Sequence, residues 1–112
     1  MTQDVPTTAL MIDVSTEGAA VTIKLQGEVD PHTAPRVEGE IRAALLSPAV
    51  DTLILDLSGV AFMDSSGLRV VIAAHRSMRE RDGRLVLRSP SPTVARLLEI
   101  TQLAGEIDIE AS

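Results

Sequence analysis

The feature that most constrains the fold is a short apolar segment, Leu53-Ile54-Leu55-Asp56-Leu57, which Ser58-Gly59 follows. A run this short, with one polar residue, is typical of a strand that is buried on both faces. Such a strand needs a neighbouring strand on each side and other elements packed on its faces. We therefore predict that residues 53–57 form the central strand of a sheet that is covered by helices.

The sequence around this strand predicts a series of strands and helices. Apolar and polar residues alternate over 10–14 and 21–25, and the turn-forming segment 15–18 between them indicates an opening β-hairpin. Helical periodicity follows over 34–45, with Pro35 in its first turn, and again from Ser65 to about Arg81. The expected core stripe of this second helix is Leu68, Val71, Ile72, His75 and Met78.

The last third of the chain predicts a strand at 85–87 and a third helix. Ser91-Pro92 is a strong helix start, and Val94, Leu97 and Leu98 would form the apolar face of that helix. Residues 107–109 are compatible with a short closing strand or with an extended tail.

Size and composition exclude several classes of protein. A chain of 112 residues provides one core, so we expect a single domain over 1–112, with the order of residues 1–9 left open and 110–112 as a tail. Its 16 acidic residues against 10 basic ones, without a basic run, argue against direct binding of nucleic acid. No run is long enough to span a membrane, and neither cysteines nor an evident secretory signal occur, so we expect a cytoplasmic protein.

Polar residues follow two of the predicted strands. The crossover through the first helix makes strand 21–25 parallel to strand 53–57, so both end at the same edge of the sheet. Asp30 and His32 follow the first strand, while Asp64, Ser65 and Ser66 follow the second, and we expect these side chains to gather there.

The segment Asp64-Ser65-Ser66-Gly67 lies where a loop enters a helix. Backbone N–H groups and the helix dipole favour negative charge at that position, so a phosphoryl group would find donors there. Asp and Ser also serve as ordinary helix caps for the same reason. Phe62 and Met63, just before the cap, could await a partner or turn inward to fill a core that has no other aromatic residue.

Two stretches carry a resemblance to a known family. Residues 27–34, Gly-Glu-Val-Asp-Pro-His-Thr-Ala, and residues 56–68, which end in Phe-Met-Asp-Ser-Ser-Gly-Leu, resemble the STAS domain of bacterial anti-sigma factor antagonists. The segments 83–87 and 91–98 also resemble the family's later strand and helix. The resemblance implies an α/β fold in which a mixed four- to five-stranded sheet opens with a hairpin and is covered by about three to four helices.

The resemblance also implies a function. A family member binds an anti-sigma factor that is also a serine kinase, and thereby releases the sigma factor to RNA polymerase. The phosphoacceptor maps to Ser66, with Ser65 as the alternative. Residues expected to support the phosphosite or bind the partner are Asp30, His32, Met63, Asp64, Ser65, Gly67 and Leu68.

The chain itself is expected to be neither an enzyme nor a cofactor-binding protein. It has no phosphate-binding Gly-rich motif, and its one lysine, Lys24, falls in a strand. The partner kinase would therefore supply ATP and Mg²⁺, and a serine phosphatase would remove the phosphate.

Three other functions share single features with this sequence. A serine hydrolase needs a base beside Ser66. His75 lies about 13 Å along the same helix, whereas His32 could come near through the shared edge of the sheet, but no nucleophile-elbow motif surrounds the serine. A phospho-aspartate receiver would need a lysine beside its acids, and Lys24 is misplaced for that role. The third is a non-catalytic STAS adaptor in a signalling scaffold or a lipid-transport complex, which the sequence does not exclude.

Overall fold

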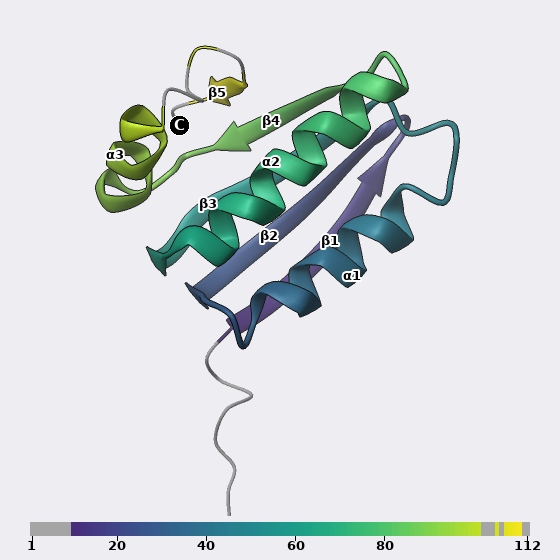
Figure 1. Ribbon diagram of the computed structural model, residues 1–112. Coiled ribbons are helices and arrows are strands. Elements are labelled where there is room, and N and C mark those ends of the chain that lie inside the picture. Colours follow the sequence, from purple (N-terminus) through teal and green to yellow (C-terminus); the bar gives the residue numbers. More distant parts are fainter. Residues whose placement is uncertain (1–9, 102–104, 106, 111–112) are drawn as a thin grey trace, which may run out of the picture.

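The computed structural model describes residues 10–101, 105 and 107–110. They form a five-stranded sheet in the order β1-β2-β3-β4-β5, with β1 antiparallel to β2 and all other neighbours parallel (Figure 1). In chain order the elements are β1 (Leu10–Glu17), β2 (Ala20–Val29), α1 (Ala34–Ala44), β3 (Thr52–Met63), α2 (Ser65–Glu80), β4 (Arg84–Arg88), α3 (Pro92–Ile100) and β5 (Asp108–Glu110). The predicted α/β class, the opening hairpin and the helix-covered mixed sheet are confirmed.

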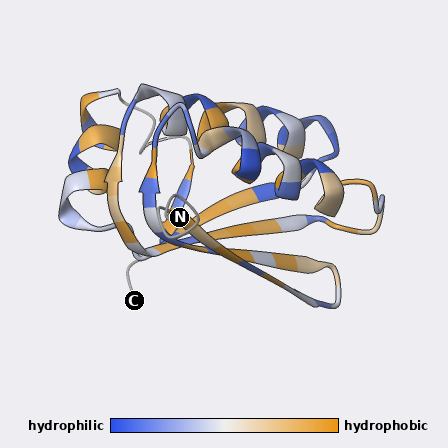
Figure 2. Ribbon diagram, turned by 90° about the horizontal axis from the view of Figure 1, so that it is seen from below, coloured by the Kyte–Doolittle hydropathy of each residue, from blue (hydrophilic) through white to orange (hydrophobic). Residues whose placement is uncertain are grey.

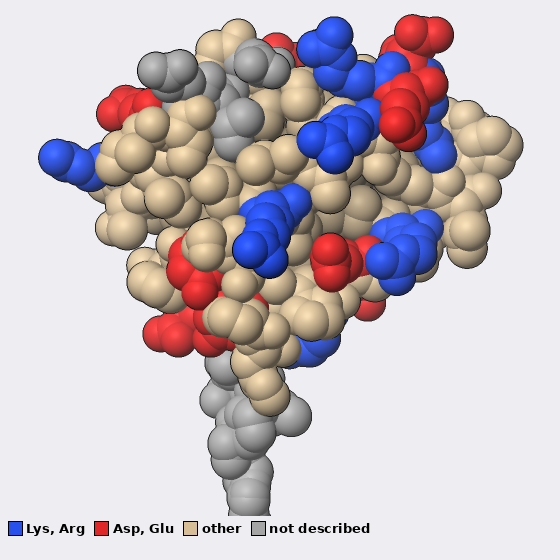
Figure 3. All heavy atoms as spheres, viewed as in Figure 1, with Lys and Arg blue, Asp and Glu red and all other residues tan. Residues whose placement is uncertain are grey.

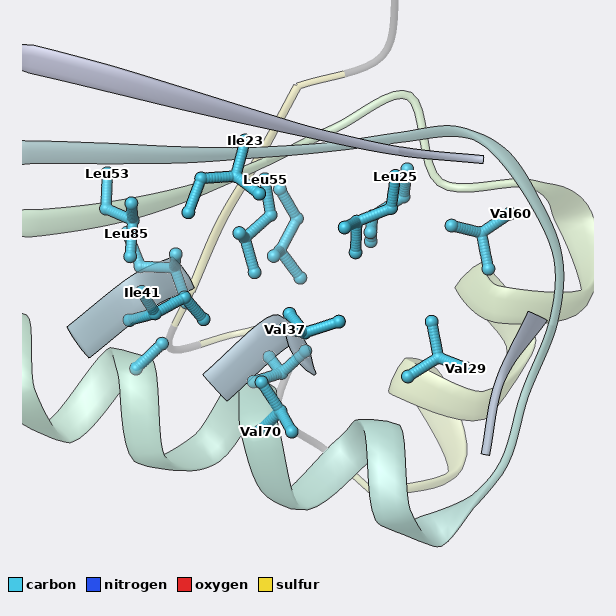
Figure 4. Packing of buried hydrophobic residues seen from close by; sticks show 14 of the residues in the cluster. Ile23, Leu25, Val29, Val37, Ile41, Leu53, Leu55, Val60, Val70 and Leu85 are labelled. Atoms are coloured by element: carbon cyan, nitrogen blue, oxygen red, sulfur yellow. The ribbon is translucent and has the colours of Figure 1, made fainter. Parts of the chain in front are cut away.

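The core lies between one face of the sheet and the helices. Alternate residues of β2 and β3, among them Ile23, Leu25 and Leu55, point toward Val37 of α1 and Val70 of α2 (Figure 4). All of these side chains are at most 4% exposed, and burying one aliphatic side chain contributes about 1.5–3 kcal/mol. β3 is the middle strand, as its apolar run predicted.

The other face of the sheet carries no helix among the described residues (Figure 2). Aligned residues of all five strands place alternating charges along one row of this face, namely Asp13, Lys24, Asp56, Arg88 and Glu110. Partial burial raises the pKa of Asp56, but hydrogen bonds from Ser58 and the charges of Lys24 and Arg88 outweigh it, so this pKa lies below its usual range. The mixed row keeps this face polar without giving it a strong net charge.

β3 is longer than predicted, because Ser58-Gly59 does not end it. The strand continues to Met63 through two irregularities in its pairing with β2, and at each of them β3 carries one extra residue. A Cβ at Gly59 would lie 2.8 Å from the Gln26 Cγ, so glycine here allows a close approach of strands rather than a turn.

The core stripe of α2 also differs from the prediction. The buried residues are Gly67, Val70, Val71, Ala74 and Met78, whereas Leu68, Ile72 and His75 are only partly buried. At the first turn, Gly67 lets the helix backbone come close to Val29 and Met63. Val71 and Met78 of the predicted stripe are thus confirmed, and the buried face is turned from the predicted one toward Gly67, Val70 and Ala74.

The C-terminal strand includes a residue that we had assigned to the tail. Glu110 belongs to β5, where its carbonyl accepts the N–H of Ser89 at 2.6 Å and its carboxylate pairs with the Arg88 Nε at 2.7 Å. The predicted closing strand is therefore present, and it begins and ends one residue later than expected. Residues 1–9 and 111–112 lie outside the described part of the chain.

Candidate functional site

The entrance of α2 is fixed by Asp64. This residue has extended backbone geometry, and its carboxylate accepts the N–H of Ser66 at 2.8 Å, which makes it the N-cap of the helix. Its carbonyl accepts the N–H of Leu68 at 3.1 Å. The capping role that the sequence left open is therefore present, and it holds Ser65 and Ser66 in the first helical turn.

A direct backbone hydrogen bond joins the two loops that were expected to meet. The N–H of Asp64 donates to the carbonyl of Val29 at 3.2 Å, and Val29 is aligned with Met63 at the ends of β2 and β3. Asp30 and Asp64 therefore leave adjacent strands at adjacent positions, as the parallel pairing predicted. Acidic side chains gather at this corner of the molecule, at the lower left of Figure 3.

Asp30 organises the loop that leads into α1. Its carboxylate accepts the N–H groups of His32 and Thr33, each at 2.9 Å. The N–H of Thr33 lowers the pKa of Asp30 most, partial desolvation opposes it, and the N–H of His32 and the Thr33 hydroxyl add to the lowering. Asp30 is thus held ionised beside the start of α2, while the His32 side chain is exposed.

Thr33 is a structural member of the site that sequence reasoning missed. It is only 2% exposed, and its hydroxyl donates to the carbonyl of Glu28 at 2.8 Å and accepts the N–H of Asp30 at 3.0 Å. The signal was present, since an Asp followed three residues later by Thr is a frequent pattern in capped turns. Thr33 fixes the direction in which the Asp30 carboxylate points.

The residues of the serine segment differ in exposure. Ser65 is exposed, Ser66 and Leu68 are half-buried, and Gly67 is buried. The two serines stand in the first turn of a 16-residue helix, where backbone N–H groups and the dipole stabilise added negative charge. Either hydroxyl could carry a phosphate without leaving it unsolvated.

Phe62 and Met63 point to opposite faces of the sheet. Met63 is 6% exposed, and its side chain packs where a Cβ on Gly67 would lie, 2.5 Å from the Met63 Cγ. Phe62 is 44% exposed. Of these two residues, only Met63 fills the core. We therefore leave its buried side chain out of the partner-binding surface to which the sequence analysis assigned it.

His75, the histidine of α2, lies away from the serine segment. His75 lines a small hollow with Arg84 and Leu85 at the β4 side of α2, and its Nε2 is buried without a hydrogen-bond partner among the described residues. In residues 10–101, 105 and 107–110, no group of three or more acidic or histidine side chains is placed to hold a metal ion. No helix in this part of the chain is long and apolar enough to cross a membrane.

The helix-covered mixed sheet that opens with an antiparallel hairpin is the fold of STAS domains. Residues 11–112 match the STAS domain family model, and the chain belongs to this family. It is 37% identical over 83 residues to the anti-sigma F factor antagonist of Lysinibacillus sphaericus, covering 74% of this chain and 71% of that protein. It is 38% identical over 90 residues to the anti-sigma-B factor antagonist of Listeria monocytogenes, covering 80% of this chain and 78% of that protein.

Solved structures agree with this grouping. The chain superimposes on the unphosphorylated anti-sigma factor antagonist SpoIIAA with a TM-score of 0.79, at 29% identity, over 91% of this chain and 90% of that one. The phosphorylated form of the Bacillus cell fate determinant SpoIIAA gives a TM-score of 0.74 at 28% identity, over 91% and 93% of the two chains. The chain is thus one of the anti-sigma factor antagonist family, whose members are regulators rather than enzymes.

Proposed function

We propose that this protein binds an anti-sigma factor that is also a serine kinase, and that its binding releases a sigma factor to RNA polymerase in the cytoplasm. Phosphorylation of Ser66 ends the interaction, and a serine phosphatase restores it. The observation that carries this proposal is the position of Ser66, in the first turn of α2, two residues after the Asp64 cap and beside the ionised Asp30 loop. Relatives at 37% and 38% identity are antagonists of anti-sigma factors, and one antagonist of this fold has a phosphorylated form.

The chain acts as ligand and substrate. The kinase supplies ATP and Mg²⁺, while Asp64 and Asp30 hold the acceptor loop in place and orient it toward the partner. Ser66 is preferred over Ser65 because the family's acceptor maps to it and because its own N–H is fixed by Asp64 at 2.8 Å. A held backbone limits the directions in which the hydroxyl can point.

Phosphorylation weakens the complex through charge. A phosphoserine adds about −1.5 to −2 charges at neutral pH. This charge would stand beside Asp30 and Asp64 and face the phosphates of the nucleotide on the kinase. At an effective dielectric constant near 20, repulsion between unit charges about 5 Å apart amounts to roughly 3 kcal/mol, which is about a 100-fold loss of affinity. The helix N-terminus satisfies the phosphate locally, so the fold itself stays unchanged.

The proposal is tested by incubating the protein with the anti-sigma factor kinases of the source organism and ATP-Mg²⁺. Mass spectrometry then locates the phosphate, with Ser65→Ala and Ser66→Ala as a matched pair. We expect Ser65→Ala to be modified and Ser66→Ala to bind the kinase without being modified. If the Ser66→Ala variant were phosphorylated at Ser65, Ser65 would be the acceptor. If the wild-type chain were neither phosphorylated nor bound by a kinase, the result would favour the adaptor role.

A further inference from the structure

Phe62 is the one aromatic residue of the chain, and β3 presents it to solvent. Side chains of β3 point inward at Leu53, Leu55 and Leu57, and the first extra residue of the strand moves the next inward position to Val60. A second extra residue, between the pairs Gly27–Val60 and Glu28–Phe62, shifts the alternation back. The two irregularities together leave Phe62, the largest apolar side chain of this segment, pointing outward and Met63 pointing inward.

The neighbours of Phe62 make this corner acidic. Glu28 is aligned with Phe62 on β2 and is also exposed. Since Val29 and Met63 face α2, the preceding residues Glu28 and Phe62 point to the opposite, helix-free face of the sheet. Asp30 lies two residues after Glu28, and Asp64 lies two residues after Phe62. An exposed aromatic side chain with a carboxylate beside it thus lies directly next to the serine segment.

We propose that Phe62 and Glu28 form a second docking surface for the anti-sigma factor kinase, reaching around the sheet edge from the Ser66 site. The proposal rests on the proposed function for the identity of this partner. The complementary surface on the kinase is an apolar pocket that takes the phenyl ring, bordered by a Lys or Arg that pairs with Glu28. Charge complementarity supports this occupant, because Glu28, Asp30 and Asp64 together favour a basic partner surface.

Exposed aromatic residues of this kind dominate the affinity of many interfaces, because they bury a large apolar area at a low entropic cost. Phe62 takes no part in the phosphoryl transfer, so it contributes equally to the bound ground state and to the transition state. Removal of its ring is therefore expected to raise the KM of Ser66 phosphorylation while leaving kcat unchanged. Glu28 is expected to act mainly on the association rate and its dependence on salt.

The test uses the purified full-length protein and the anti-sigma factor kinases of the source organism in the presence of ADP and Mg²⁺, with the Kd measured by calorimetry. We expect Phe62→Ala to weaken binding about 10- to 30-fold. Phe62→Met, which keeps an apolar side chain of similar length, should stay within about threefold of wild type. The matched control is Leu46→Ala, in the turn that follows α1, which removes an apolar side chain that is 80% exposed and should leave Kd unchanged.

A charge-reversal pair tests the acidic half of the surface. Glu28→Lys should slow association several-fold at low salt, whereas Glu17→Lys, which makes the same change of net charge at the hairpin end of β1, should not. Equal slowing by both variants would show that only net charge matters and would overturn the role of Glu28.

The outcomes separate the docking surface from the proposed function. If a kinase phosphorylates Ser66 but binds Phe62→Ala as tightly as wild type, the docking surface is wrong and the proposed function stands. If binding depends on Phe62 but Ser66 is never modified, the docking surface stands and the phosphorylation switch is wrong. If no anti-sigma factor kinase binds the wild-type chain, both are overturned.

Discussion

Two glycines in helices should respond to alanine in opposite directions. Neither has a positive φ, so the backbone at both positions suits alanine. Gly39 lies in the middle of α1, exposed, with no atom within 4 Å of the position of an added Cβ. Gly67 lies in the first turn of α2, where a Cβ would be 2.5 Å from the Met63 Cγ and 2.9 Å from the Val29 Cγ1.

The expected magnitudes follow from these distances. Replacing an exposed helical glycine by alanine stabilises a helix by about 0.5–1 kcal/mol, so Gly39→Ala should raise the free energy of unfolding by that amount. At Gly67 the same gain is offset by overpacking, which costs about 1–3 kcal/mol when the neighbours cannot move. Val29 is a β-branched residue within a strand and only 1% exposed, so its side chain cannot move far to make room for the added methyl group. We expect Gly67→Ala to lower the free energy of unfolding by about 1–2 kcal/mol.

The assay is urea and thermal denaturation followed by circular dichroism on both variants and wild type. For a domain of this size, 1 kcal/mol shifts Tm by about 4 °C or slightly more, so the two variants should differ by about 6–12 °C. If Gly67→Ala were as stabilising as Gly39→Ala, the close approach of α2 to Met63 and Val29 would not exist in solution, and our account of how the serine segment is positioned would fail.

Three further predictions use the same measurements. Asp64→Ala should lower the free energy of unfolding by about 1 kcal/mol through loss of the N-cap, and a stability equal to wild type would show that the cap is not formed. Arg81 donates three hydrogen bonds to carbonyls of the loop after α1, so Arg81→Ala should cost about 1.5–3 kcal/mol, whereas the exposed Arg79→Ala should change stability by less than about 0.5 kcal/mol. The pKa values of Asp30 and Asp56 are lowered on folding, so their stabilising contribution is present above the unfolded value of 3.8 and is lost as the pH falls below it. Asp30→Asn and Asp56→Asn should each flatten the acid limb of the stability–pH curve, and an unchanged limb would contradict the lowered pKa.

The elements that the sequence predicted correctly are those with a local physical cause. The short apolar run at 53–57 indicated a central strand because only a strand with neighbours on both sides buries such a segment. Ser91-Pro92 indicated the start of α3, and the Ser91 hydroxyl does accept the N–H of Val94 at 3.4 Å. The meeting of Asp30 and Asp64 followed from topology, since strands joined by a helical crossover are parallel and end together.

What only the tertiary structure decided depends on contacts between distant segments. The bulges in β3 are set by its pairing with β2, and no local pattern shows where an extra residue enters a strand. The first extra residue moved Val60 onto the inward face, and the second restored the alternation, so that Met63 is buried and Phe62 exposed. The buried face of α2 was decided by how closely Gly67 can approach Val29 and Met63, because steric fit depends on the shape of the opposing sheet as well as on the hydrophobicity of the helix.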